Sequence, residues 1–157
     1  MRPIDKNMKP LIVLIATFLI AVLTLHFIHG GYEWAFAARI AMAVMLFFTA
    51  SAHFAFTKGM EMMMPAGIPF KKGLVYITGI LEILGGIGLL VPGWIAVTGI
   101  CLILFFIAVL PANIHAALKQ VDYQKGTNSG NGIKYLWFRI PLQLLFIAWV
   151  YFSAVAV

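Results

Sequence analysis

Charged residues are scarce in this sequence. They make up 10% of its 157 residues, while 63% of the residues are hydrophobic. A soluble domain carries roughly 25% charged residues, so this composition excludes an ordinary soluble protein. We predict an all-α, polytopic membrane helix bundle in contact with the lipid bilayer. The apolar stretches leave no room for a separate soluble domain, so we expect a single domain over residues 1–157.

Cysteine is almost absent, and Cys101 is the only one. An intrachain disulfide and a CxxC redox pair are therefore excluded, and any redox chemistry needs a bound group. Acidic residues are also few, with five against eleven Lys and Arg. The basic residues lie between apolar segments rather than in one patch, which is typical of membrane topology and argues against nucleic-acid binding.

Five apolar segments are long enough for membrane helices, which need about 20 residues each. We place them at about residues 11–28, 34–56, 74–91, 94–118 and 135–155. Ten of the eleven basic residues then fall on one side and only Arg39 on the other, which predicts a cytoplasmic N-terminus and an outside C-terminus. A cleaved signal peptide is the alternative for residues 11–28. The length of this run and the lack of an A-x-A-like site favour a retained helix.

Glu82 is the one ionisable residue of the segment 74–91 and lies near its middle. An Asp at mid-membrane costs about 2.5–3.5 kcal/mol, and we expect Glu to be comparable. Glu82 should therefore face the bundle interior and be paired or protonated. Small residues dominate its helical face, which predicts a close packing surface. The residues on that face are Val75, Thr78, Gly79, Gly85, Gly86 and Leu89.

Each residue of an α-helix advances about 1.5 Å along the axis, so the position of a residue in a span gives its depth in the membrane. Four further polar residues have similar depths. We place them roughly 5–10 Å from the cytoplasmic boundary, with Glu82 about 13 Å deep. These residues are His53, Asn113, Arg139 and Gln143. Arg39 approaches Glu82 from the outer side and shares a helical stripe with His53. Depth does not decide whether Arg39 or Arg139 is the partner of Glu82.

Such a cluster favours a polar pocket that opens toward the bilayer. Its chemistry suits a lipid-soluble molecule with carbonyl or hydroxyl groups, and we expect a quinone. The alternative is structural, with polar groups that only specify helix packing. We disfavour haem, because His53 and His115 have no further ligand motif beside them. We also disfavour a Cu(I) site at the methionines of residues 60–64, because flexible Met side chains commonly fill membrane interfaces.

Two segments are too polar or too broken to span a membrane. Residues 57–73 hold two prolines and three lysines, which predicts an interfacial loop or short helix. Residues 119–134 are rich in Gly, Asn and Ser. We expect a solvated, mobile loop there, with no catalytic group.

Four separated segments resemble, in the correct order, the DoxX family of small bacterial membrane proteins. They are SAHFAF at 51–56, YITGILEILGGIGLLVPG at 76–93, LPANIHAAL at 110–118 and RIPLQLLFIAW at 139–149. The resemblance covers roughly residues 38–151 and implies a four-helix core in a bacterial inner membrane. The helix at 11–28 is an addition, which either shields the core or supports a homo-oligomer.

The DoxX resemblance also implies a function. It points to a subunit or accessory of a quinone-linked membrane oxidoreductase or redox-stress system, with a soluble or membrane redox partner subunit. The alternative is a non-enzymatic scaffold or assembly factor. Carried onto this sequence, the polar positions that match are His53, Glu82, Asn113, Arg139 and Gln143, with Arg39 just before the stronger part of the match.

Overall fold

The computed structural model describes residues 8–157, and this part of the chain is helical, as the sequence predicts. The helices are α1 (Lys9–His29), α2 (Trp34–Ala55), α3 (Thr57–Met63), α4 (Lys71–Gly88), α5 (Ile95–Leu118) and α6 (Ile133–Val150). A short π-helical turn, η2 (Tyr151–Val155), continues α6. The interfacial segment therefore contains the short helix α3.

Four of these helices are long and apolar enough to cross a membrane, which is consistent with a membrane protein. They are α1, α2, α5 and the continuous stretch Ile133–Val155. The fifth predicted span is not confirmed. Its helix, α4, ends at Gly88 and has only 18 residues, which include the charged Lys71, Lys72 and Glu82.

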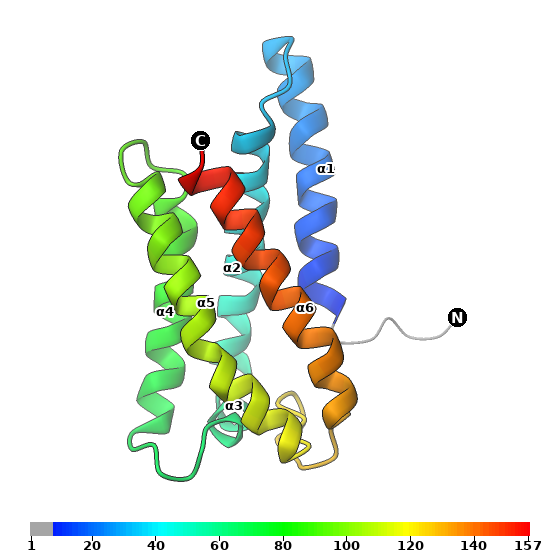
Figure 1. Ribbon diagram of the computed structural model, residues 1–157, viewed down its shortest axis with the longest axis vertical. Helices are drawn as coiled ribbons and strands as arrows, with labels where there is room; N and C mark the ends of the chain where they lie inside the picture. Colours follow the sequence, from blue (N-terminus) through cyan, green and yellow to red (C-terminus); the bar gives the residue numbers. More distant parts are fainter. Residues whose placement is uncertain (1–7) are drawn as a thin grey trace, which may run out of the picture.

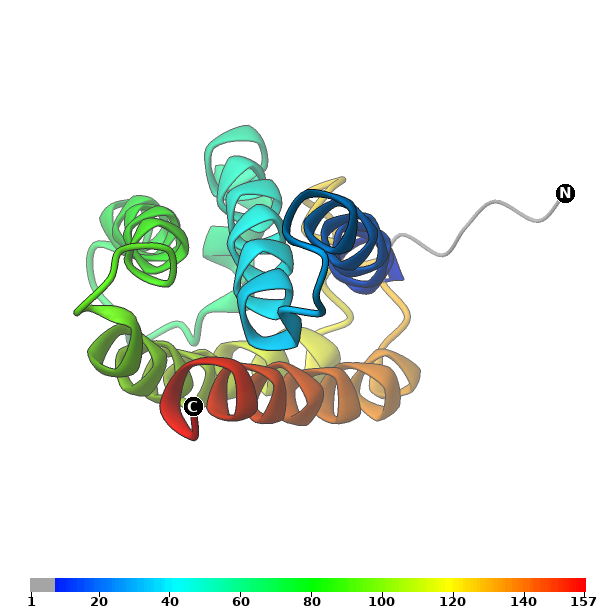
Figure 2. The ribbon, with the colours of Figure 1, turned by 90° about the horizontal axis from the view of Figure 1, so that it is seen from above.

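The helices form two layers. Viewed from above, α4, α2 and α1 stand side by side in one row, and α5 and α6 lie across it (Figures 1 and 2). α2 is the middle helix of its row and packs against α4 on one side and α1 on the other. Small side chains allow this, since Ala37, Ala41, Ala43 and Ala50 of α2 are all buried.

The predicted packing face of α4 is confirmed. A Cβ atom placed on Gly79 would lie 2.9 Å from Cβ of His53, and one on Gly86 would lie 2.7 Å from the ring of Phe47, both on α2. Gly85 contacts Leu102 of α5 in the same way, at 2.6 Å. Glycine at these positions therefore sets how closely α4 approaches its neighbours.

Basic residues gather at one end of the bundle. Toward this end, the lower one in Figure 1, lie the starts of α4 and α6, the end of α5, and α3, while α1 begins about halfway up the bundle. Of the nine Lys and Arg residues of 8–157, seven belong to the segments at this end or their loops, Lys9 begins α1, and Arg39 lies in the opposite half. Arg2 and Lys6, which also entered the predicted topology, lie outside the described residues.

Gly59 makes the tightest contact between α3 and the loop that follows α5. It is buried, and a Cβ there would overlap the backbone carbonyl of Tyr123. We expect Gly59→Ala to lower the free energy of unfolding by about 1–3 kcal/mol through overpacking, measured by chemical unfolding in detergent. Gly67→Ala is the control, because a Cβ at Gly67 meets open space. Equal stability of both variants and the wild type would contradict this contact.

Candidate functional site

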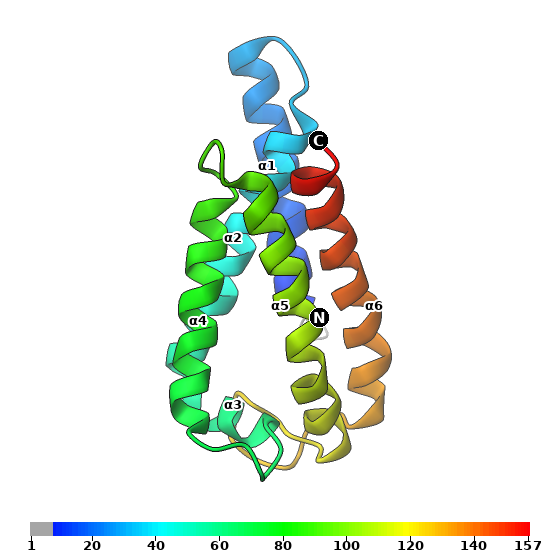
Figure 3. The same cartoon turned by 60° about the vertical axis from the view of Figure 1, so that its left-hand side comes forward.

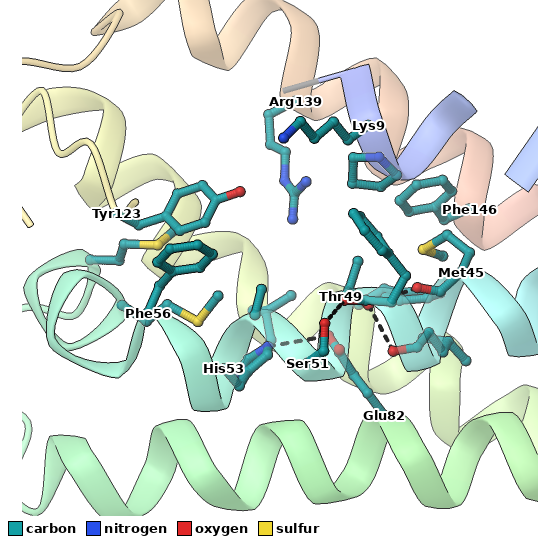
Figure 4. Close-up of a pocket in the computed structure, with 18 of the residues that line it drawn as sticks. Lys9, Met45, Thr49, Ser51, His53, Phe56, Glu82, Tyr123, Arg139 and Phe146 are labelled. Atoms are coloured by element: carbon teal, nitrogen blue, oxygen red, sulfur yellow. Dashed lines mark hydrogen bonds and ion pairs between the residues drawn. The ribbon is translucent and has the colours of Figure 1, made fainter. Parts of the chain in front are cut away.

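A cavity of about 310 Å³ lies between the two layers. Figure 4 shows side chains from several helices that surround it. Every helix contributes to the lining, and one representative from each of α1 to α6 is Lys9, His53, Met60, Glu82, Phe106 and Arg139. The first turn of α1 therefore helps to enclose the cavity.

His53 and Glu82 form an ion-pair contact in the cavity wall, with Nε2 of His53 3.4 Å from Oε1 of Glu82. The other ring nitrogen, Nδ1, lies 3.0 Å from the carbonyl oxygen of Val75 and 3.0 Å from Oγ1 of Thr78. A carbonyl oxygen only accepts, so Nδ1 is the donor and carries a proton. Nδ1 therefore anchors the ring, and Nε2 faces the carboxyl group of Glu82.

Neither arginine is the close partner of Glu82, contrary to the expectation from the sequence. Within residues 8–157, His53 is the only basic side chain within 4.0 Å of the Glu82 carboxylate. Figure 4 shows the guanidinium of Arg139 across the cavity from His53 and Glu82. A histidine on the neighbouring helix, held close by Gly79, has taken the role assigned to arginine.

Two buried atoms of the cavity lining lack a hydrogen-bond partner among the described residues. They are Oε2 of Glu82 and Nε of Arg139. A buried polar group left without a partner costs roughly 1–3 kcal/mol, so such groups normally have one. The two side chains line the cavity from opposite walls, so a carboxyl group and a guanidinium group stand across the cavity from each other.

Gln143 and Asn113 have different positions. Gln143 lines the cavity, and its Nε2 donates a 2.6 Å hydrogen bond to the carbonyl of Phe106. This carbonyl is next to that of Ile107, whose helical donor is removed by Pro111. Asn113 is buried but is not part of the cavity wall.

Arg39 lies in the other half of the bundle, away from Glu82. Its Nη1 donates to the carbonyl of Ser153 at 3.0 Å. Ser153 is in η2, near the end of the last helix, where backbone carbonyls lack helical donors. Arg39 therefore acts as a cap on that helix end, where a positive charge is favourable.

The loop between α5 and α6 contributes to the cavity, which the sequence did not predict. Tyr123 and Gln124 line it, and the Tyr123 ring packs edge-on against Phe56 at 6.2 Å between centroids. Burial raises the pKa of Tyr123 above its ordinary value of 10.0, so its hydroxyl keeps its proton at neutral pH and can donate. An aromatic residue inside an otherwise polar loop is the one sequence signal for this role.

α3 is fixed over the cavity by His115. Its Nδ1 donates a 3.0 Å hydrogen bond to the carbonyl of Met63, the last residue of α3. His115 is not part of the cavity wall, whereas Met60 and Met63 are. His53 and His115 are therefore not brought together as a ligand pair by the cavity.

These features define a helical bundle, with helices of membrane-spanning length, that encloses a cavity with charged and apolar side chains in its lining. Residues 42–154, more than half of the chain, match a family described as a domain of unknown function (DUF8561), and the chain belongs to this family. The DoxX resemblance was wrong, because the matching family is a different one. The segments that suggested DoxX are mostly apolar, and one of them is rich in glycine, a composition that unrelated membrane helices share. No curated protein and no solved structure matches the chain.

Proposed function

We propose that this protein binds a quinone, or a similar lipid-soluble molecule with oxygens at opposite ends of a ring, in the cavity between its layers. The observation that carries the proposal is that the carboxyl group of Glu82 and the guanidinium group of Arg139, each with a buried atom that has no partner among the described residues, line opposite walls of the cavity. A ring with two opposed oxygens can use both, accepting from Arg139 at one end and meeting the Glu82 and His53 pair at the other.

The chemistry at the two ends differs. Arg139 is always a donor, so it suits a carbonyl or an anionic oxygen. Imidazole and carboxyl groups can each donate a proton to a carbonyl oxygen or accept one from a hydroxyl, so the pair of His53 and Glu82 suits either kind of ligand oxygen. We therefore propose a role as quinone-binding subunit or accessory of a membrane oxidoreductase or redox-stress system. The electrons would come from a redox partner subunit.

We further propose that α4 crosses the membrane as a fifth span, in a bacterial inner membrane. The fifth span is supported by the packing of α4 along α2, because α2 itself is long and apolar enough to cross the membrane. Lys71 and Lys72 lie in the first turn of α4, so they can reach the interface by extending toward water. The end of the bundle rich in basic residues would face the cytoplasm.

This topology makes a direct prediction for reporter fusions. Fusions after Lys125, in the loop between α5 and α6, and after Val157 should report opposite sides of the membrane, because α6 and η2 separate them. Paired phosphatase and fluorescent reporters would measure this. If both positions report the same side, the last span is absent and the proposed orientation fails.

Binding can be tested on the purified protein. Organic extraction followed by chromatography should recover a quinone, and an added short-chain quinone at about 100 times its Kd should stabilise the protein by roughly 2.7 kcal/mol. Glu82→Gln and Arg139→Gln should each reduce this stabilisation. Arg39→Gln is the matched control, since Arg39 is also partly buried but bonds Ser153 outside the cavity. Equal quinone responses of all three variants would overturn the proposal.

A structural scaffold or assembly factor is the second candidate. The supporting observation is that several polar side chains already serve packing, including Gln143 on the Phe106 carbonyl and Trp149 on the Ala38 carbonyl, at 2.6 and 3.0 Å. Under this function, Glu82→Gln would change stability, but no quinone would stabilise or co-purify with the wild type.

A further inference from the structure

Phe105 of α5 stands between the cavity and a second hollow. This is an open groove of about 790 Å³ between α4 and α5, and Phe105 belongs to the lining of both. The groove is lined almost entirely by apolar side chains, among them the exposed Leu84 and Leu104. Figure 3 shows that α4 and α5 are joined by a tight connection at one end and diverge toward the other.

The same two helices serve both hollows. On α4, Glu82 lines the cavity, and its chain neighbour Leu81 lines the groove. On α5, Phe106 lines the cavity, while Phe105 reaches both. The two hollows therefore adjoin at Phe105, and the charged side chains belong to the cavity alone.

The volumes suggest different contents. Small-molecule pockets range over about 300–1,000 Å³, so the cavity of about 310 Å³ is near the lower end. It suits a ring-sized head group and leaves no room for a long tail. The groove, at about 790 Å³, is the larger space.

We infer that the groove holds the apolar tail of the molecule whose head group occupies the cavity, an inference that rests on the proposed function. Bulk lipid chains are as apolar as the groove, so hydrophobicity alone does not select an occupant in a membrane. Once the head group is bound, its tail is held close to the groove, so the tail has a high effective concentration there. This favours the tail over free lipid chains. The ligand class is thus a quinone with a long apolar tail.

Cys101 provides a natural reporter of groove occupancy. It is exposed, lines the groove and is the only cysteine of the chain. Its alkylation rate with N-ethylmaleimide can be followed by mass spectrometry, without ligand, with decylubiquinone, and with a tail-less quinone of the same head group. At about ten times its Kd, the tailed quinone should slow alkylation roughly tenfold, because about nine-tenths of the sites are occupied. The tail-less quinone should leave the rate unchanged.

Two variants make this protection specific. In Glu82→Gln, weaker head-group binding should remove the protection by decylubiquinone. In Cys101→Ser combined with Leu19→Cys, the thiol lies on the exposed face of α1, outside the groove, and should react at the same rate with either quinone.

The outcomes separate the inference from the proposed function. If both quinones raise the melting temperature of the wild type but Cys101 reacts unchanged, the tail lies elsewhere, and the inference is overturned while head-group binding stands. If decanol at the same concentration protects Cys101 equally, the groove accepts any apolar chain, which also overturns the inference. If neither quinone raises the melting temperature, the proposed function fails and the inference fails with it.

Discussion

Replacing His53 with leucine should lower the free energy of unfolding by about 3–5 kcal/mol, the usual cost of removing one partner from a buried ion pair. The side chains of His53 and Glu82 are only 16% and 11% exposed, so water cannot compensate the carboxylate that remains. The Val75 carbonyl keeps another donor, because Thr78 Oγ1 donates to it at 2.9 Å. The loss therefore measures the pair itself, by chemical unfolding in detergent.

The chain contains a matched control for this pair. His29 and Glu33 also form a His–Glu contact, but their side chains are 46% and 42% exposed. Exposed pairs contribute about 0–1 kcal/mol, so His29→Leu should have little effect. Replacing both His53 and Glu82 by leucine should restore part of the stability, since no uncompensated buried charge remains. A loss in His53→Leu no larger than that in His29→Leu would contradict a charged pair.

Replacing Gly79 and Gly86 together with leucine should be the second most damaging change. Their positions contact His53 and Phe47 so closely that any side chain must push α4 away from α2. Overpacking costs about 1–3 kcal/mol at one site, and the pair should cost up to about 6 kcal/mol, less where both side chains are relieved by one displacement of α4. The same displacement should separate His53 from Glu82 and weaken the quinone response.

Gly73→Leu is the control for this change, because it lies on the same helix and a Cβ there meets open space. Leucine is a better helix former than glycine by nearly 1 kcal/mol, so this variant should be neutral or slightly more stable. Melting temperatures of the variants in one detergent would test the prediction. A double variant as stable as Gly73→Leu would show that α2 and α4 are not in close contact.

Much of the fold could be predicted from local patterns. The apolar runs and the Pro92–Gly93 pair predicted where the helices lie. Gly93 makes the turn between two of them, with the left-handed backbone that glycine favours and a φ of 87°. The fifth span could not be confirmed, because α4 starts at Lys71 and carries charge at both its start and its middle. Apolar patterning alone did not identify the family either, since lipid contact imposes a similar composition on unrelated helices.

The candidate site was predicted in part. Helical rise fixes depth, and four of the residues that depth grouped, His53, Glu82, Arg139 and Gln143, line one cavity in the structure. Rise does not fix which helices are neighbours, so Asn113 was included although it lies outside the cavity wall. Tyr123 was missed, because a single aromatic residue in a polar loop does not show that the loop folds back over the bundle.

The pairing of α2 with α4 also bears on how the chain enters the membrane during synthesis. His53 is made before Glu82, so it is already present in the preceding hairpin when the carboxyl group reaches the bilayer. A Glu inserted alone would meet a penalty close to the roughly 2.5–3.5 kcal/mol of an isolated Asp. With His53 available at 3.4 Å, the two helices can enter as one hairpin whose polar groups face each other. Arg139 and Gln143 are made only with the last helix. During insertion, the polar side of α4 would therefore be covered by α2 before α6 is made.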